Sequence, residues 1–384
     1  MTLPCQRHLF DLPEDVAYLN CAYMGPLSSA VLSAGVEGLG NKSQPWKIEP
    51  GDFFAPLVRA RELFGQVIGG DDDGVAMVPS VSYGMAVAAA NLPVPQGGNI
   101  IVLDEQFPSN VYIWRQLAAE RGAEVLTVPR PADDDWTRQV LAAIDERTAV
   151  VALPHCHWTD GTMVNLEQVG ERARESGAAL VVDGCQSIGA LPLDVAAIQP
   201  DFLVTASYKW LLGPYSYGFL WVAPQWRQGR AIEQNWIARS NAEDFAAVAR
   251  YTDSYAEGAR RFDVGEVSNF ALLPAAIAAL EQTLQWGVEE VQATIGLLTR
   301  RIADRARQLG LQVAAENRRA GHLIGLRLGN RSPQHMAAAL KAEKIHVSVR
   351  GTSIRVSPHV YNSERDVAHF LRVLEAALKS MPAG

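Results

Sequence analysis

The sequence predicts an α/β protein with a mostly parallel seven-stranded sheet, helices on both of its faces, and a smaller C-terminal α+β domain. From Val75 to Val204, apolar strand-sized runs alternate with helical stretches. Nearly continuous apolar runs are typical of parallel strands that are buried on both faces and joined by helical crossovers. Beyond residue 310 the apolar runs are shorter and more closely spaced, which indicates a second unit with antiparallel strands.

Seven apolar runs predict the strands of the large sheet: 75–78, 99–103, 124–128, 149–153, 180–182, 202–204 and 219–222. Helices are expected at 53–68, 85–90, 111–121, 137–145 and 166–176. The last run follows its predecessor too closely for a helical crossover. It therefore predicts an antiparallel hairpin partner or an edge strand.

The remaining elements lie at the two ends of the chain. An extended segment at 16–20 precedes a Gly-Pro turn and a helix rich in Ser and Ala. A long helix is predicted at 271–309, with an interruption near Gly287. Strands at 323–328, 345–349 and 353–356 and helices at 333–343 and 363–380 follow it. We expect residues 1–20 to pack near the functional site, 21–268 to form the large domain, and 269–384 to supply an interdomain helix and the small domain.

Composition excludes several classes of protein. The 384 residues are 48% hydrophobic, as in ordinary globular proteins, and the formal charge of −8 without a basic block argues against nucleic acid as a partner. The apolar runs are too short to span a membrane. The first residues lack the apolar core of a signal peptide, and the four cysteines form no paired framework. These features predict a cytoplasmic protein with reduced thiols.

A lysine and an aspartate follow neighbouring strands of the predicted sheet. Lys209 comes shortly after the run 202–204, and Asp183 ends the run 180–182. Carboxyl ends of parallel strands meet at one edge, where ligands bind. An amine in apolar surroundings forms a Schiff base, and a carboxylate keeps a pyridine nitrogen protonated, so the pair predicts pyridoxal phosphate (PLP). A solvated loop lysine and a helix-capping aspartate are the alternative for each residue alone.

Two more loops at this edge carry suitable groups. The segment 79–84 opens a helix, and its backbone N–H groups and the Ser82 hydroxyl form a phosphate cradle. Phe107 follows the second strand, where its ring can cover the pyridine face, although it could equally be a core residue. The run His155-Cys156-His157 is rejected as a metal site, because the Cys points away from both His and no second ligand cluster exists.

Arg355 lies inside an apolar strand near the C-terminus. A guanidinium keeps its charge when buried, so it needs a carboxylate partner. A structural salt bridge would supply one from the protein. An amino-acid substrate would supply one as its α-carboxylate, which arginine binds through two parallel hydrogen bonds.

Taken together, these motifs resemble the fold-type I PLP enzymes of the aminotransferase class V group, which includes cysteine desulfurases, kynureninases and isopenicillin N epimerases. The resemblance covers about residues 15–375 and implies the PLP-dependent transferase fold. It implies that Lys209 is the Schiff-base lysine and that Asp183 pairs with the pyridinium nitrogen. It also implies a homodimer whose active sites lie at the subunit interface.

The resemblance assigns further residues to the cofactor and the substrate. Gln186 would hydrogen-bond the phenolic oxygen, and Phe107 would stack on the ring. The remaining cofactor contacts are expected from Ser82 and Tyr208 at the phosphate, from Val81 and Trp158, and from Asn269 at the phosphate of the neighbouring subunit. The substrate contacts are expected from Arg355 at the α-carboxylate, from Asn20 in a segment that closes over the substrate, and from Arg350 as a rival anchor or a helper for a second acidic group.

Departures from the desulfurase pattern narrow the reaction. Desulfurases carry His where Phe107 and Tyr208 stand and Asn where Trp158 stands, and they need a Cys on a loop before the carboxylate-binding Arg. No Cys follows Cys185 in this chain. The Ser-Tyr-Lys motif and the Arg355 region look more like kynureninase, but epimerase-like and C–S lyase-like relatives share several of the other motifs.

The sequence therefore predicts a PLP-dependent enzyme that acts on a small amino-acid substrate through a Cα carbanion. A lyase-type reaction that removes a side-chain substituent is expected, with class V transamination or amino-acid epimerisation as alternatives. A non-catalytic protein of this fold would be expected to lose Lys209 or Asp183, and both are present. A dinucleotide-binding dehydrogenase is excluded, because the segment 79–84 contains one glycine instead of the Gly-rich fingerprint.

Overall fold

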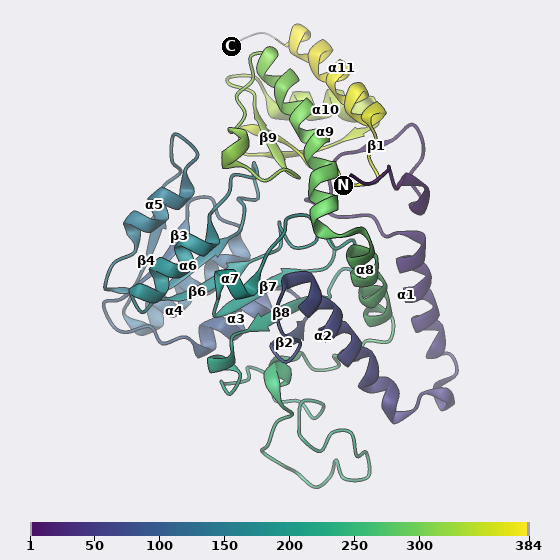
Figure 1. The fold of residues 1–384 in the computed structure, drawn as a ribbon, viewed down its shortest axis with the longest axis vertical. Coiled ribbons are helices and arrows are strands. Elements are labelled where there is room, and N and C mark those ends of the chain that lie inside the picture. Colours follow the sequence, from purple (N-terminus) through teal and green to yellow (C-terminus); the bar gives the residue numbers. More distant parts are fainter. Residues whose placement is uncertain (1, 382–384) are drawn as a thin grey trace.

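The computed structural model describes residues 2–381 (Figure 1). Its centre is a seven-stranded sheet in the order β2-β8-β7-β6-β5-β3-β4. Strands β3 to β7 pair in parallel, whereas β8 runs antiparallel to both β2 and β7. The strands are β2 (Val75–Val78), β3 (Asn99–Leu103), β4 (Glu124–Val128), β5 (Thr148–Pro154), β6 (Ala179–Asp183), β7 (Phe202–Ala206) and β8 (Gly218–Val222). The predicted sheet is confirmed, but the edge-strand alternative for 219–222 is wrong, because β8 has a neighbour on each side.

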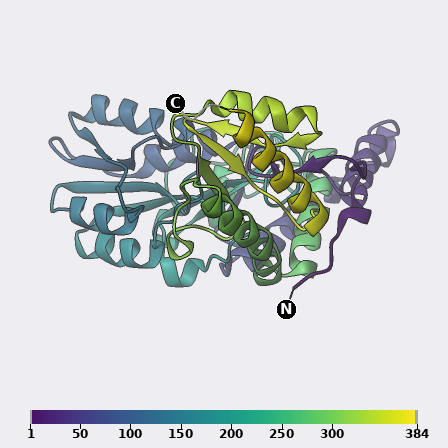
Figure 2. The ribbon, with the colours of Figure 1, turned by 90° about the horizontal axis from the view of Figure 1, so that it is seen from above.

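Helices cover both faces of this sheet, as Figure 2 shows. One face packs against α2 (Ala55–Ile68), α5 (Trp136–Ala143), α6 (Leu166–Glu175), α7 (Val195–Ile198) and α8 (Leu272–Trp286). The other packs against α3 (Val81–Asn91) and α4 (Tyr112–Arg121). Strand residues alternate between these two apolar cores. In β7, for example, Leu203 joins the first core, whereas Phe202 and Val204 join the second.

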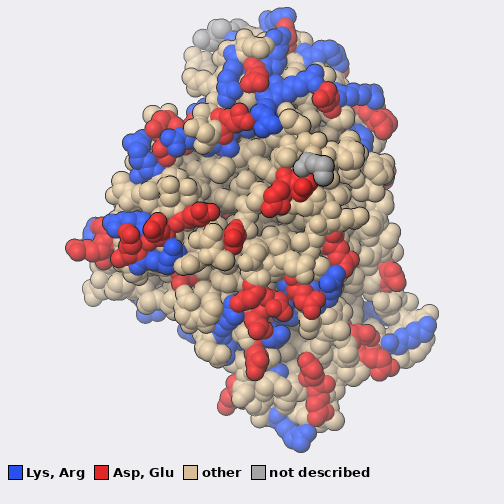
Figure 3. Space-filling view, viewed as in Figure 1, with Lys and Arg blue, Asp and Glu red and all other residues tan. Residues whose placement is uncertain are grey.

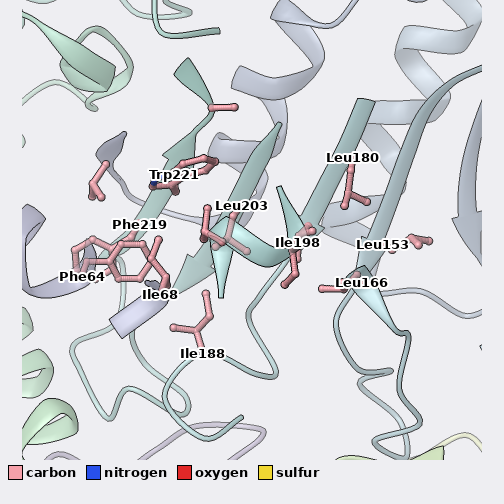
Figure 4. Packing of buried hydrophobic residues seen from close by; sticks show 14 of the residues in the cluster. Phe64, Ile68, Leu153, Leu166, Leu180, Ile188, Ile198, Leu203, Phe219 and Trp221 are labelled. Atoms are coloured by element: carbon pink, nitrogen blue, oxygen red, sulfur yellow. The ribbon is translucent and has the colours of Figure 1, made fainter. Parts of the chain in front are cut away.

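Aromatic packing contributes to the first core. The Phe64 ring of α2 stacks on the Phe219 ring of β8, with centroids 4.4 Å apart and planes 12° apart (Figure 4). Both side chains are fully buried. Burying one such side chain stabilises the fold by about 1.5–3 kcal/mol. This packing fixes the strands on which the loops at their carboxyl ends are mounted.

A second, smaller unit contains the three-stranded antiparallel sheet β11-β12-β9. Its elements are β9 (Ile324–Arg327), β10 (Ile345–His346), β11 (Ser348–Arg350), β12 (Ser353–Val356), α9 (Val288–Gln308), α10 (Pro333–Ala342) and α11 (Glu364–Ser380). Strand β1 (Ala17–Tyr18) pairs in parallel with β10, so Ala17 and Leu19 belong to the apolar core of this unit.

One segment differs from its predicted boundaries. The predicted strand 345–349 is divided, because β10 pairs with β1 while β11 pairs with β12. The predicted interruption of the long helix near Gly287 is confirmed, because Gly287 separates α8 from α9. Gly287 has a φ angle of 77°, a conformation that glycine adopts without steric cost.

Charged side chains of both signs are interspersed on the small unit, at the top of Figure 3. Two ion pairs join α9 to α11, Arg301 with Glu364 and Arg305 with Glu375. Exposed pairs of this kind contribute about 0–1 kcal/mol each. Within residues 2–381, no helix combines the length and the apolar character needed to cross a membrane.

The packing of α1 (Ser29–Asn41) on α8 gives a matched pair of glycine substitutions. A Cβ atom at Gly38 would lie 2.0 Å from the Phe270 carbonyl oxygen, whereas one at Gly40 would meet no atom within 4 Å. We expect Gly38→Ala to lower the free energy of unfolding by about 1–3 kcal/mol through overpacking. Gly40→Ala should raise it by roughly 0.5–1 kcal/mol, because alanine favours the helix. Equal effects in denaturant titrations would contradict this packing.

Candidate active site

A cavity of about 290 Å³ opens where β2, β3, β5, β6 and β7 end. It lies at the carboxyl edge of the parallel strands, where ligands bind in open α/β sheets. The loops that follow these strands supply most of its wall. Eight residues that the sequence assigned to the site line the cavity: Val81, Ser82, Phe107, Trp158, Asp183, Gln186, Tyr208 and Lys209.

The Lys209 side chain is buried and ends between two aromatic rings. Its Nζ atom lies 5.4 Å from the centre of the Phe107 ring and 5.5 Å from that of Tyr208. Cations within about 6 Å of a ring face are attracted to the ring electrons. These contacts hold the amine in the cavity without an ion pair among the described residues.

Asp183 is the last residue of β6 and is 6% exposed. Its Oδ1 atom accepts a hydrogen bond of 3.0 Å from the Cys185 backbone N–H. Burial raises the pKa of this carboxyl, and the Lys209 charge partly offsets the increase. A buried carboxylate without a close cation is costly, so a cationic N–H group in the cavity would stabilise it.

The first turn of α3 lines the cavity. Ser80 caps the helix by accepting a hydrogen bond from the Tyr83 N–H, and its hydroxyl lies 2.9 Å from the Ser82 hydroxyl. N–H groups in a first helical turn have no acceptor inside the helix, and the helix dipole favours negative charge there. Val81 and Ser82 therefore offer a phosphate site at this point.

Gln186 is held in one orientation at the cavity wall. Its Oε1 atom accepts a 2.9 Å hydrogen bond from Trp210, and its Nε2 atom donates one of 3.1 Å to the Ala22 carbonyl. The second Nε2 hydrogen is left for a ligand. Sequence reasoning placed Gln186 in the site but did not foresee the two contacts that fix it.

Phe107 and Trp158 form an aromatic corner of the cavity. Their rings meet edge to face, 5.4 Å apart and at 82°. The Trp158 indole N–H donates to the Glu105 carbonyl at 2.7 Å, which fixes the corner. Phe107 is 38% exposed, so it is not the core residue that the sequence left open as an alternative.

Arg355 belongs to β12, contacts Trp158 and is 1% exposed. Its Nη1 atom donates a 2.8 Å hydrogen bond to the Trp158 carbonyl, whereas Nε and Nη2 are buried without a partner. Burial and then the neighbouring Arg350 charge lower the pKa of Arg355 to about 9. No acid in residues 2–381 forms an ion pair with Arg355, so the structural salt bridge considered from the sequence is wrong.

Asn20 and Asn269 lie outside the cavity wall. The Asn20 Oδ1 atom accepts a 2.7 Å hydrogen bond from the Ser348 hydroxyl, beside the strand that carries Arg355. Asn269 is exposed and caps α8 by accepting from the N–H groups of Ala271 and Leu272. Its assignment to the cofactor of a neighbouring subunit stays a prediction.

Sequence reasoning missed three residues of the β7–β8 connection that line the cavity, Tyr215, Ser216 and Tyr217. The Tyr215 ring centre lies 4.6 Å from that of Tyr208. Ser216 has a φ angle of 63°, as turn residues often have. The signal was available, because Lys209 itself lies in the connection between the antiparallel strands β7 and β8, which turns at this edge of the sheet.

Comparisons with known proteins bear on this arrangement. The model of the family "Aminotransferase class-V" matches residues 51–373. The chain belongs to the aminotransferase class-V family. It is therefore a PLP-dependent enzyme.

Relatives in the class-V family differ in their named reactions. The chain is 28% identical to the uncharacterized aminotransferase YcbU of Bacillus subtilis over 91% of this chain and 90% of that protein. It is 26% identical to isopenicillin N epimerase of Streptomyces clavuligerus, over 85% and 87% of the two chains. It is 30% identical to kynureninase of Pseudomonas fluorescens, over 57% and 54%.

Solved structures confirm the fold. A mutant of C-DES with glycine covalently linked to the PLP cofactor superposes with a TM-score of 0.87 at 20% identity, covering 96% of this class-V chain and 99% of that chain. Cysteine desulfurase CsdA of Escherichia coli superposes with a TM-score of 0.84 at 19% identity and full coverage of both chains. At these identities the likeness extends to the fold.

The cavity of this class-V enzyme suits PLP at three points. The first turn of α3 offers N–H groups for the phosphate, the Asp183 carboxyl lacks a close cation, and the Lys209 amine is free to bond to an aldehyde. PLP, when bound, supplies an electron sink for bonds broken at an amino-acid Cα. Across residues 2–381, no three His, Cys, Asp or Glu side chains gather as metal ligands would.

Borohydride reduction tests the assignment of Lys209. Reduction of the PLP-loaded protein should label the peptide that contains Lys209, and Lys209→Ala should remove the label. Asp183→Asn is the matched variant. It should keep the label but lose roughly 100- to 1,000-fold in turnover, the effect of removing one preorganised electrostatic partner. Peptide mapping that places the label on another lysine would overturn the assignment.

Proposed function

We propose that this class-V enzyme removes a substituent from the side chain of an amino acid. Arg355 supports the proposal that the substrate is an amino acid, because its buried Nε and Nη2 atoms have no partner. A substrate α-carboxylate would accept two parallel hydrogen bonds from such a guanidinium. The Trp158 carbonyl fixes the third nitrogen, so the fork is oriented before the substrate arrives.

Lys209 is the residue proposed to move the proton at Cα. Its amine lies in the same cavity as Asp183 and Tyr208, and a lysine that would hold PLP as a Schiff base would serve as a base once it is free of the cofactor. The centres of the Phe107 and Tyr208 rings lie 5.4 and 5.5 Å from its Nζ atom, and Trp158 lines the same cavity, so aromatic surface would displace part of the water around the reacting bond. The presence of kynureninases among the relatives supports the proposal that a side-chain substituent is lost.

Transamination is the second candidate. It is favoured by YcbU, which is named an aminotransferase and matches most of this chain. Epimerisation stays as a third outcome, since isopenicillin N epimerases are also relatives. The three reactions begin with the same loss of a proton from Cα and differ in the bond that forms or breaks next.

Sulfur transfer through a protein persulfide is not proposed, although probable cysteine desulfurases are among the relatives. The chain has Cys5, Cys21, Cys156 and Cys185 and none further along. Cys156 and Cys185 line the cavity, but burial raises the pKa of both thiols. A protonated thiol is a poor nucleophile.

An amino-acid panel distinguishes these reactions. Elimination of a β-substituent should release pyruvate and ammonia together, and a kynureninase-type cleavage should release alanine. Transamination should need an added keto acid and release no ammonia, and epimerisation should yield only the other enantiomer. Persulfide formed on the protein from cysteine would contradict the exclusion of sulfur transfer.

Arg355→Lys tests the carboxylate contact. Lysine keeps the charge but loses the planar fork, and a hydrogen bond to a charged group is worth about 1.5–3 kcal/mol. We expect KM to rise roughly 10- to 100-fold while the cofactor spectrum stays unchanged. An unchanged KM would indicate that the substrate lacks a free α-carboxylate.

We propose that the active enzyme is a homodimer with the active site at the subunit interface. Helix α1, at the right edge of Figure 1, exposes Leu32, Val36 and Leu39 at spacings of four and three residues. A contiguous exposed apolar stripe of this kind is typical of protein interfaces. Val36→Asp should therefore shift sedimentation toward the monomer and reduce turnover. A fully active wild-type monomer at assay concentration would refute the proposal.

A further inference from the structure

The β11–β12 hairpin has one apolar and one polar face. Its register pairs Ser348 with Arg355, and Arg350 with Ser353. Directly opposed residues share a face of a sheet, and so do residues two apart in one strand. These four side chains therefore lie on one face, and the other face contributes Ile354 to the apolar core.

A third arginine on this face provides a comparison. Arg327 of β9 pairs with Ser353 in the same sheet. It donates to Asp134 at 2.7 Å and to Asp160 at 3.2 Å, so its charge is neutralised. Arg350 and Arg355 form no ion pair with any acid in residues 2–381. The fold thus balances one guanidinium on this face and leaves two unbalanced.

Both unbalanced guanidinium groups contact Trp158, which lines the cofactor cavity. Arg355 donates to the Trp158 carbonyl, and the Arg350 guanidinium carbon lies 5.3 Å from the centre of the indole ring. Arg350 donates through Nη1 to the Val349 carbonyl at 2.7 Å, and its Nε atom is buried without a partner. Burial lowers the pKa of Arg350, and the Tyr23 phenol opposes part of this effect.

Two cations at diagonal positions of a hairpin repel one another, and an unpaired charge buried as deeply as that of Arg355 is costly, whereas Arg350 is half-buried. Evolution of a stable fold would favour neutralising them as Arg327 is neutralised, unless an anion is bound there for function. A single carboxylate on Arg355 would leave Arg350 unpaired. A ligand with two anionic groups would satisfy both guanidinium groups.

We propose that the substrate is an amino acid whose side chain ends in a carboxylate or sulfinate, with Arg355 binding the α-carboxylate and Arg350 the distal group. The inference rests on the proposed function and adds the substrate class to it. The guanidinium fork of Arg350 matches a planar or near-planar pair of oxygens. The Trp158 ring holds that fork in place from one side.

Binding of unreactive acids tests the inference without turnover. The PLP-loaded protein is titrated by calorimetry with succinate and glutarate, and with the matched monoacids butyrate and valerate. We expect one diacid to bind at least 10-fold more tightly than its monoacid. Arg350→Gln should reduce this ratio to about 1, because it removes the contact to the second acid group. The Kd of the monoacid, which lacks that group, should stay within about twofold of the wild-type value. A tenfold difference in affinity corresponds to about 1.4 kcal/mol.

Arg239→Gln is the matched control. Arg239 also lies over an aromatic ring, 4.2 Å from the centre of Tyr255, and it forms no ion pair among the described residues. Its loss removes one positive charge outside the cavity and should leave the diacid preference unchanged. Borohydride labelling of Lys209 and the thermal unfolding temperature establish that each variant folds and holds the cofactor.

The outcomes separate this inference from the proposed function. In one outcome, the wild-type protein shows no preference for diacids, but Arg355→Lys abolishes monoacid binding. That result would overturn the proposal of an acidic substrate side chain and would still support an amino-acid substrate. Failure of both acid classes to bind would overturn both. As a second measurement, kcat/KM for aspartate and cysteine sulfinate should exceed that for asparagine, and the difference should vanish in Arg350→Gln.

Discussion

Burial of the central sheet on both faces is the constraint on which the rest of the molecule depends. Each strand sends alternate residues into two separate apolar cores, as Leu203 and Val204 do in β7. A strand held from both sides cannot slide or rotate without opening one core. The residues at its carboxyl end are therefore fixed relative to those of the next strand. For this reason Asp183 and Lys209 line the same cavity, although they are 26 positions apart in the sequence.

The site then gathers polar groups that the fold itself does not satisfy. Asp183 lacks a close cation, the first turn of α3 offers N–H groups, and Arg355 has two guanidinium nitrogens without partners. Arg61 and Asp263, by contrast, are buried and form an ion pair with each other. Buried polar groups are ordinarily hydrogen-bonded, so several unsatisfied groups around one cavity are consistent with a ligand site.

Much of the fold and of the site could be predicted from the sequence. Most of the strands were identified because burial on both faces makes their runs almost continuously apolar, whereas β4 is largely exposed. The rule that ligands bind at the carboxyl ends of parallel strands then brought Lys209, Asp183 and Phe107 together. The division of residues 345–349 could not be predicted, because it depends on β1, which arrives from the other end of the chain. The missing partner of Arg355 is likewise a tertiary property, since a sequence does not show which acids lie within reach. The assignment of Asn269 needs a second subunit.

The positions of the two anchors have a consequence for motion. Residues assigned to PLP come from the large α/β domain, whereas Arg350 and Arg355 lie on the hairpin of the small unit. A substrate bound to PLP and to these arginines would connect the large domain to the small unit. In the described chain, the Arg327 ion pairs with Asp134 and Asp160 already connect the two. Binding free energy would then resist separation of the two units, by the linkage that couples any ligand to the conformation it prefers. The substrate would act as a reversible crosslink between the large domain and the small unit, and product release would weaken the contact between them.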